Sequence, residues 1–279
     1  MTALAGKVAL ITGAGRTGGM GQATARRFAE AGANVVVTDL ARDRPELRGN
    51  ETHGLGDDLA VMQKFASALE TEFGVRSLAL PLDVTDQGQA DEVVATTVSE
   101  LGSLDILFNN AGATTGVGWF MDQTDEQWDL SWQVNAMGTR RMSMLAIPVM
   151  AAQGAGVIIN NISVGGLVAD AGYGAYCASK FAVAAITKLV AKEHGKDGIR
   201  SVGVCPGVID TGMAEANRRL VGELEGVTDD EAWEMMLSAI PLGYPGQADD
   251  VAQLVAFLAS PAARFISGAL IQIDGSMLE

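Results

Sequence analysis

The chain has 279 residues, of which 48% are hydrophobic and only 5% aromatic, a composition typical of a soluble α/β protein whose core is filled by Val, Ile, Leu and Ala. Its formal net charge of −15 argues against binding to a phosphate backbone, so we expect no nucleic-acid partner. The two cysteines, Cys177 and Cys205, provide neither a disulfide framework nor the pattern of a metal site.

The first segment reads as strand, glycine-rich turn, helix and strand. Val8–Ile11 and Val35–Val37 are apolar, β-branched runs that predict two parallel strands. Between them, Gly13 permits a tight turn, Gly19 permits close approach of a phosphate, and Gly21 lets the helix pack close to the strand. The pattern therefore predicts a βαβ unit that holds the pyrophosphate of a dinucleotide at the amino end of its helix.

Asp39 ends the second of these strands, 18 residues after Gly21. This is close to the separation of about 20 residues expected for the acid that binds a ribose 2′-hydroxyl. Its charge would repel a 2′-phosphate, so we expect NAD rather than NADP as the cofactor. Arg16 and Arg42 argue the other way, because either guanidinium could reach a phosphate.

A long polar stretch follows at residues 41–57, where either a surface insertion or a wall over the adenosine end of the cofactor is expected. Strands and helices alternate after it. Further strands are predicted at residues 78–84, 104–112, 156–163, 199–207 and 269–274, and helices at 90–101, 126–150, 173–194 and 249–259. This alternation predicts one α/β domain over residues 1–279, with a doubly wound, parallel, seven-stranded sheet of Rossmann type covered by helices on both faces.

Ser163, Tyr176 and Lys180 are the strongest candidates for chemistry. Tyr176 and Lys180 lie four residues apart in a segment rich in helix formers, so they share one helix face. The ammonium group should lower the pKa of the phenol toward the range of a general acid or base. Ser163 follows a buried strand, and its hydroxyl is expected at the carboxyl edge of the sheet, where α/β proteins bind ligands.

These motifs resemble those of the short-chain dehydrogenase/reductase family over nearly the whole chain. Thr12 and Gly13 open a loop similar to the family's TGxxxGxG, although with two extra residues, and residues 110–112 match its Asn-Ala-Gly. Ser163, Tyr176 and Lys180 match its catalytic Ser and Tyr-x-x-x-Lys. The resemblance implies a catalytic group of Asn135, Ser163, Tyr176 and Lys180.

The resemblance also implies a set of cofactor contacts along the chain: Gly13, Arg16, Gly19, Met20, Gly21, Asp39, Leu40, Asp83, Val84, Asn110, Ala111, Gly112, Tyr176, Lys180, Pro206, Gly207, Ile209 and Thr211. It implies a helical substrate lid at about 212–245. The expected substrate contacts are Ser163, Val164, Tyr173, Tyr176 and Met213. Together with Leu167 and the apolar run Trp119–Met121, they predict a pocket for a fairly hydrophobic molecule.

The expected function is reversible, NAD-dependent transfer of a hydride between the cofactor and a secondary alcohol or ketone. Two alternatives stay open: an NADP-dependent 3-oxoacyl thioester reductase and a non-catalytic dinucleotide-binding protein on the same fold. A serine hydrolase is disfavoured because no G-x-S-x-G surrounds Ser163. The three-residue gap between Tyr176 and Lys180 disfavours enoyl reductases of this superfamily, in which the gap is usually longer.

No apolar run reaches the roughly 18 to 20 residues that span a bilayer, and the amino terminus lacks the pattern of a signal peptide. We therefore expect a cytoplasmic protein with a small-molecule substrate and no membrane partner. The family resemblance implies a homotetramer assembled through the helices at 126–150 and 173–194 and the last strand.

Overall fold

The computed structural model describes residues 3–40, 59–115 and 117–278. Its strands are β1 Val8–Thr12, β2 Asn34–Asp39, β3 Ser77–Pro81, β4 Ile106–Asn109, β5 Gly156–Asn161, β6 Ile199–Pro206, β7 Ile209–Asp210, β8 Gly246–Gln247 and β9 Leu270–Ile273. Its α-helices are α1 Met20–Glu30, α2 Leu59–Phe73, α3 Gln87–Leu101, α4 Asp125–Ser131, α5 Gly138–Gln153, α6 Gly174–His194, α7 Gly212–Glu225, α8 Asp229–Ser238 and α9 Ala248–Ala259. The insertion at 41–57, with Arg42, lies outside the described residues.

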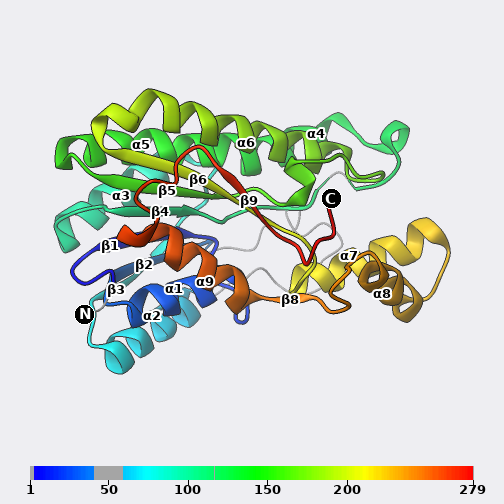
Figure 1. Ribbon diagram of the computed structural model, residues 1–279, viewed down its shortest axis with the longest axis horizontal. Helices are drawn as coiled ribbons and strands as arrows, with labels where there is room; N and C mark the ends of the chain where they lie inside the picture. The colour runs from blue at the N-terminus through cyan, green and yellow to red at the C-terminus, as the bar shows by residue number, and fades with distance from the viewer. Residues whose placement is uncertain (1–2, 41–58, 116, 279) are drawn as a thin grey trace.

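A seven-stranded sheet forms the centre of the molecule, in the order β3-β2-β1-β4-β5-β6-β9. Each neighbouring pair of its strands runs parallel. Helices α1, α2 and α9 cover one face, and α3, α5 and α6 cover the other (Figure 1). The expected doubly wound fold is therefore confirmed. From β1 the chain adds strands toward one edge of the sheet, and from β4 it adds strands toward the other edge. This reversal leaves a crevice at the carboxyl ends of β1 and β4.

Two hydrophobic cores hold the layers together, because successive residues of a strand point to opposite faces of the sheet. Val35 and Val37 of β2 pack with Phe28 of α1 in one core. Val36, between them, joins Met142 of α5 in the other. Strands that are apolar on both faces thus explain the continuous apolar runs in the sequence.

The helix expected over residues 126–150 is present but contains a π-helical segment. It divides into α4, a π-helical segment at Trp132–Met137 and α5. The π turn carries Asn135 into the interior, where the side chain is fully buried. Gly138 follows this segment and lies close to Val84, which comes after the end of β3. A Cβ atom at Gly138 would lie 2.8 Å from Cγ2 of Val84. π segments of this kind occur inside α-helices and are frequent at functional sites.

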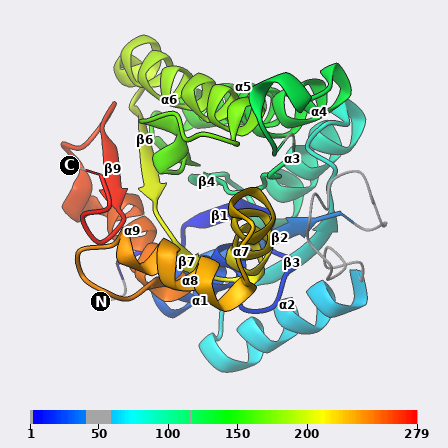
Figure 2. The same cartoon turned by 90° about the vertical axis from the view of Figure 1, so that its right-hand side faces the viewer.

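Three further elements, α2, β7 and β8, were not predicted from the sequence. Helix α2 precedes β3, and β7 pairs with β8 in a separate parallel ribbon. Helices α7 and α8 follow β7 and lie beyond the carboxyl ends of the central strands (Figures 1 and 2). Gly226 ends α7 in a left-handed conformation, and a capping box at Thr228 begins α8. The segment expected as a lid is therefore a compact helical pair at the site's edge.

The expectation that no segment is long and apolar enough to cross a bilayer needs a correction. By length and composition alone, one helical stretch in the described part of the chain passes this test, Gly174–Asp197. It contains α6, which packs on β5 and β6 in the interior and buries Lys180 and Val183. Core helices of soluble proteins pass the same test, so this length and composition do not indicate a membrane span.

Candidate functional site

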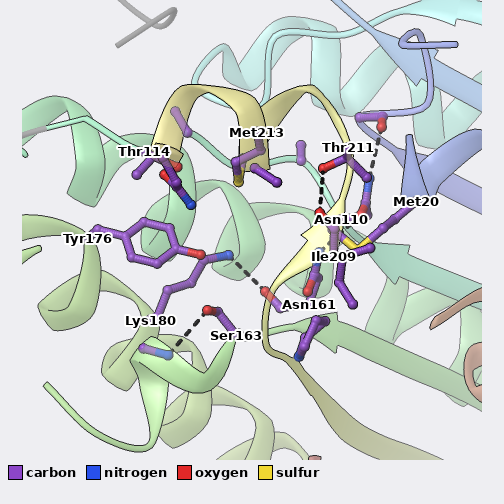
Figure 3. A pocket seen from close by; sticks show the side chains of 18 of the residues that line it. Met20, Asn110, Thr114, Asn161, Ser163, Tyr176, Lys180, Ile209, Thr211 and Met213 are labelled. Atoms are coloured by element: carbon purple, nitrogen blue, oxygen red, sulfur yellow. Dashed lines mark hydrogen bonds between the residues drawn. The ribbon is translucent and has the colours of Figure 1, made fainter. Parts of the chain in front are cut away.

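A cavity of about 390 Å³ opens at the carboxyl ends of the parallel strands. The glycine-rich turn after β1, the ends of β4 and β5, the start of α6 and the helices α7 and α8 contribute its walls. In Figure 3, Ser163, Tyr176 and Lys180 lie on one side of this pocket, and Met20, Asn110, Ile209 and Thr211 lie on the other. One continuous space therefore joins the predicted catalytic residues to the predicted cofactor residues.

The glycine-rich turn is packed backbone against backbone. A Cβ atom at Gly21 would lie 2.3 Å from the carbonyl oxygen of Gly13, and one at Gly13 would lie 2.8 Å from Cα of Ala111. Gly13 also has a φ of 69°, which favours glycine. Gly19 is the N-cap residue of α1 and has no side chain that could bond to the first N–H groups of the helix. Gly19 and Met20 both line the cavity at this point. This cradle fits the pyrophosphate of a dinucleotide.

Asp39 lies at the end of β2, directly beside this turn. Its Oδ2 accepts a hydrogen bond of 2.7 Å from the N–H of Gly15, and its Oδ1 accepts one of 2.8 Å from the N–H of Leu40. Burial raises the pKa of the Asp39 carboxyl above its ordinary value, although both hydrogen bonds and the charge of Arg16 act to lower it. A carboxylate has about four acceptor positions, so these two bonds leave room for a ribose hydroxyl.

Thr12 and Asn110 join the glycine-rich turn to the end of β4. Oγ1 of Thr12 accepts hydrogen bonds from the N–H groups of Asn110 and Ala111, both 3.0 Å long. Nδ2 of Asn110 donates to the carbonyl oxygens of Thr12 and Gly13, at 3.0 and 2.8 Å. The Asn-Ala-Gly segment thus satisfies buried backbone groups of the turn that it contacts.

Ser163, Tyr176 and Lys180 converge as the sequence predicted. The Ser163 hydroxyl lies close enough to the Tyr176 phenol to lower its pKa, and Nζ of Lys180 lies 5.6 Å from the centre of the Tyr176 ring. Nζ donates a hydrogen bond of 2.8 Å to the carbonyl oxygen of Asn161. Gly165 leaves space for the phenol, because a Cβ atom there would lie 3.2 Å from Cε1 of Tyr176.

The electrostatics of this group differ from the expectation. Burial raises the pKa of Tyr176 to about 12, although the nearby Ser163 hydroxyl acts to lower it. Burial also lowers the pKa of Lys180 to about 8. Desolvation, rather than the charge of Lys180, therefore decides the direction of the shift of the phenol. A raised pKa favours the protonated phenol of Tyr176, the state required of a proton donor.

Asn135 lies next to this group but does not line the cavity. Its Oδ1 accepts from the N–H of Ala113 at 2.9 Å, and its Nδ2 donates to the carbonyl oxygen of Ala113 at 2.9 Å and to Oγ of Ser179 at 3.0 Å. A Cβ atom at Gly112 would lie 3.1 Å from Oδ1 of Asn135 and 3.4 Å from Nζ of Lys180. The Asn135 side chain thus positions the strand-end segment against α6, and its part in a proton route stays a prediction.

The remaining predicted residues are distributed as follows. All predicted cofactor residues except Gly21 line the cavity: Gly13, Arg16, Gly19, Met20, Asp39, Leu40, Asp83, Val84, Asn110, Ala111, Gly112, Tyr176, Lys180, Pro206, Gly207, Ile209 and Thr211. The predicted substrate residues Ser163, Val164, Tyr173, Tyr176 and Met213 line it as well. Gly21 lies behind the turn and permits its close packing.

The apolar run Trp119–Met121 does not line the cavity. These side chains are 51%, 71% and 88% exposed, and Leu167 packs against the small core around Ile162 instead. The walls come from Val134 of the π turn, Val221 of α7, Met236 of α8 and Met277. Sequence reasoning missed these residues because hydrophobicity alone does not distinguish a cavity wall from an exposed tip.

Several polar residues of the cavity were also missed, namely Thr114, Asn161, Asp170 and Asn217. Asn161 had a signal in the sequence. It is the second asparagine of a doublet at the end of an apolar strand, and the doublet Asn109–Asn110 ends the neighbouring strand in the same way. The other three lie in segments without such a pattern.

Ser163 has a strained backbone that yields a stability prediction. Its φ of 85° with ψ of 155° belongs to a region that is populated almost only by glycine and costs about 1–3 kcal/mol. We expect Ser163→Gly to be more stable than Ser163→Ala by about 1 kcal/mol, because both lose the hydroxyl but only glycine relieves the strain. Thermal unfolding of the two variants measures the difference, and equal or reversed Tm values would contradict the assignment of strain.

Comparison with known proteins agrees with this geometry. Residues 13–277 match a family model described as enoyl-(acyl carrier protein) reductase. The 3-oxoacyl-(acyl-carrier-protein) reductase FabG of Thermotoga maritima is 34% identical over 275 residues, which cover 99% of each chain. Meso-2,3-butanediol dehydrogenase of Serratia marcescens is 34% identical over 269 residues, 96% of this chain and 93% of that one.

Among solved structures, NAD+-bound xylitol dehydrogenase superposes with a TM-score of 0.87 at 26% identity, over 98% of this chain and 99% of that one. Levodione reductase superposes with a TM-score of 0.86 at 29% identity, over 98% and 97% of the two chains. The site geometry and these relatives lead to one conclusion: the chain belongs to the short-chain dehydrogenase/reductase family and is an NAD(P)-dependent enzyme acting on CH–OH groups.

Proposed function

We propose that this protein is an NAD-dependent oxidoreductase that interconverts a fairly hydrophobic secondary alcohol and the corresponding ketone. The convergence of Ser163, Tyr176 and Lys180 on a cavity that is continuous with the glycine-rich turn carries the proposal. Hydride exchange with the substrate carbon is the chemistry that a nicotinamide ring supplies when it is bound.

In the direction of reduction, Tyr176 donates its proton to the substrate oxygen. The high pKa of its buried phenol keeps the proton in place until the oxygen becomes negatively charged. Ser163 donates a hydrogen bond to the same oxygen and stabilises that charge. Lys180 holds a positive charge beside the phenol and stabilises the phenolate that remains. In the direction of oxidation, Tyr176 first loses its proton to solvent, and the phenolate then accepts the proton of the alcohol.

The walls of the cavity support a largely apolar, uncharged substrate. Val134, Val164, Met213 and Met236 contribute apolar surface near the catalytic group. Asp170 also lines the cavity, where burial raises the pKa of its carboxyl. The ion pairs found among the described residues do not include Asp170. In its ionised form this carboxylate would oppose an anionic substrate.

A second candidate is reduction of a 3-oxoacyl thioester, which the relatedness to the T. maritima FabG favours. The apolar walls suit an acyl chain as well as a small ketone, so the substrate class needs a direct assay. Enoyl reduction has less support, because Tyr176 and Lys180 keep the three-residue gap typical of enzymes that act on CH–OH groups.

The proposed activity predicts the effect of removing one oxygen atom. We expect Tyr176→Phe to lower kcat about 100- to 10,000-fold, because general acid catalysis typically contributes 10²–10⁴-fold, while NADH still binds. Oxidation of secondary alcohols and reduction of ketones and acyl thioesters, followed at the NADH absorbance band, measures the change in both candidate reactions. Retention of near-normal kcat would remove Tyr176 from the mechanism. A wild-type protein that binds NADH but turns over no member of the panel would instead indicate a non-catalytic dinucleotide-binding protein.

The proposed preference for NAD rests on Asp39 beside the glycine-rich turn. We expect the wild-type enzyme to have a higher kcat/KM with NAD than with NADP, and Asp39→Asn to reduce that ratio about tenfold or more, since loss of one charge repulsion is worth at least 1.4 kcal/mol. Asparagine keeps the shape and one acceptor oxygen. Arg16→Ala is the matched control, because it tests whether the Arg16 guanidinium binds the phosphate of NADP. A wild-type preference for NADP would contradict the proposal.

We also propose that the protein is a cytoplasmic homotetramer. Apolar side chains on the outer surface of α5 and α6 support an interface there: Met144 is 53% exposed, Phe181 is 44% exposed and Leu189 is 54% exposed. Phe265, between α9 and β9, is 99% exposed and supports a second subunit interface. Light scattering on the purified protein should give about four times the chain mass of 29.0 kDa, and a monomer mass would contradict the assembly.

A further inference from the structure

We propose that Asn161 is a positioning residue that joins the catalytic Lys180 to the glycine-rich turn, so that both ends of the cofactor site share one frame. The residue ends β5, is buried except for 9% of its surface, and lines the cavity. Figure 3 shows it between the catalytic group on one side and the cofactor residues on the other. The inference rests on the proposed function only in that a dinucleotide must bind.

The two polar ends of Asn161 serve different partners. Its backbone carbonyl oxygen accepts the hydrogen bond of 2.8 Å from Nζ of Lys180. Its side-chain Nδ2 donates a hydrogen bond of 3.1 Å to Oδ1 of Asn110. One residue thus contacts α6 through its backbone and the end of β4 through its side chain.

Asn110 extends this link to the turn. Because its Oδ1 accepts from Asn161, its Nδ2 is turned toward the carbonyl oxygens of Thr12 and Gly13, at 3.0 and 2.8 Å. The amide of Asn110 has only one orientation that satisfies all three partners. A continuous chain of hydrogen bonds therefore runs from Lys180 through Asn161 and Asn110 to Gly13.

The far end of this chain lies where small displacements matter. The carbonyl oxygen of Gly13 also faces Gly21, which has no room for a Cβ atom. A shift of this carbonyl moves the start of α1 relative to the turn, and the N–H groups there are the proposed phosphate ligands. Loss of the Asn161 amide should consequently weaken cofactor binding although Asn161 is not expected to touch the phosphates.

The sharpest test reverses one hydrogen bond without changing the shape of the side chain. In Asn161→Asp the new oxygen cannot donate to Oδ1 of Asn110, so the Asn110 amide turns over and places its oxygen against the carbonyl groups of Thr12 and Gly13. Asn161→Ala removes the link and keeps the backbone carbonyl for Lys180. Asn160→Ala is the matched control, since Asn160 precedes Asn161 in the same strand and its side chain bonds to the buried Asn109 and Thr187.

We expect the dissociation constant of the reduced cofactor, measured by fluorescence titration, to rise about tenfold in Asn161→Ala and more in Asn161→Asp, as for a buried polar group left without its partner. Asn160→Ala should lower Tm and change the dissociation constant less than about twofold. In Asn161→Ala the KM for the cofactor should rise more than kcat falls, because the carbonyl that holds Lys180 is kept. Asn161→Ser replaces any variant that fails to fold.

Dissociation constants within about twofold of the wild type in both Asn161 variants would overturn the inference, as would an equal weakening in Asn160→Ala. The titration uses whichever of NADH and NADPH the wild-type enzyme binds more tightly. A preference for NADPH would therefore contradict the proposed cofactor without deciding the role of Asn161.

Discussion

The close approach of the glycine-rich turn to the end of β4 is the constraint on which the site depends. Gly13 lies against Ala111, and Gly21 lies against the carbonyl of Gly13, at distances that exclude any side chain. Such contacts bury backbone N–H and C=O groups, and burying them unpaired would cost free energy. Thr12 and Asn110 supply the missing partners. The same contacts that stabilise the turn leave the start of α1 open toward the cavity.

The two asparagine doublets show how one parallel sheet serves both its core and its site. Side chains of successive strand residues point to opposite faces. Asn109 and Asn160 therefore pair in the interior, with a hydrogen bond of 2.8 Å. Asn110 and Asn161 pair at 3.1 Å on the side of the cavity. Both pairs connect β4 to β5, so the strand that leads to Ser163 is held at a defined distance from the turn that follows β1.

Burial controls the proton chemistry of this site before any ligand binds. The four-residue spacing placed Lys180 near Tyr176, as the sequence predicted, but desolvation by the surrounding protein decides the direction of both pKa shifts. The hydroxyl of Ser163 is the group that offsets the shift of the phenol. Its strained backbone is maintained by neighbours such as Gly165, whose N–H donates to Oγ of Ser163 at 3.2 Å.

The sequence by itself determined the parallel, doubly wound sheet and the glycine-rich turn, because strand and helix periods and glycine positions are local properties of the chain. Its motifs also predicted that Ser163, Tyr176 and Lys180 come together. Only the tertiary structure decided the π turn at Asn135, the exposure of Trp119–Met121, the direction of the pKa shifts and the link through Asn161. Each of these depends on which atoms from distant segments surround a residue and exclude water from it. Asn161 and Asn110 are 51 positions apart in the chain, and no local pattern encodes the contact between them.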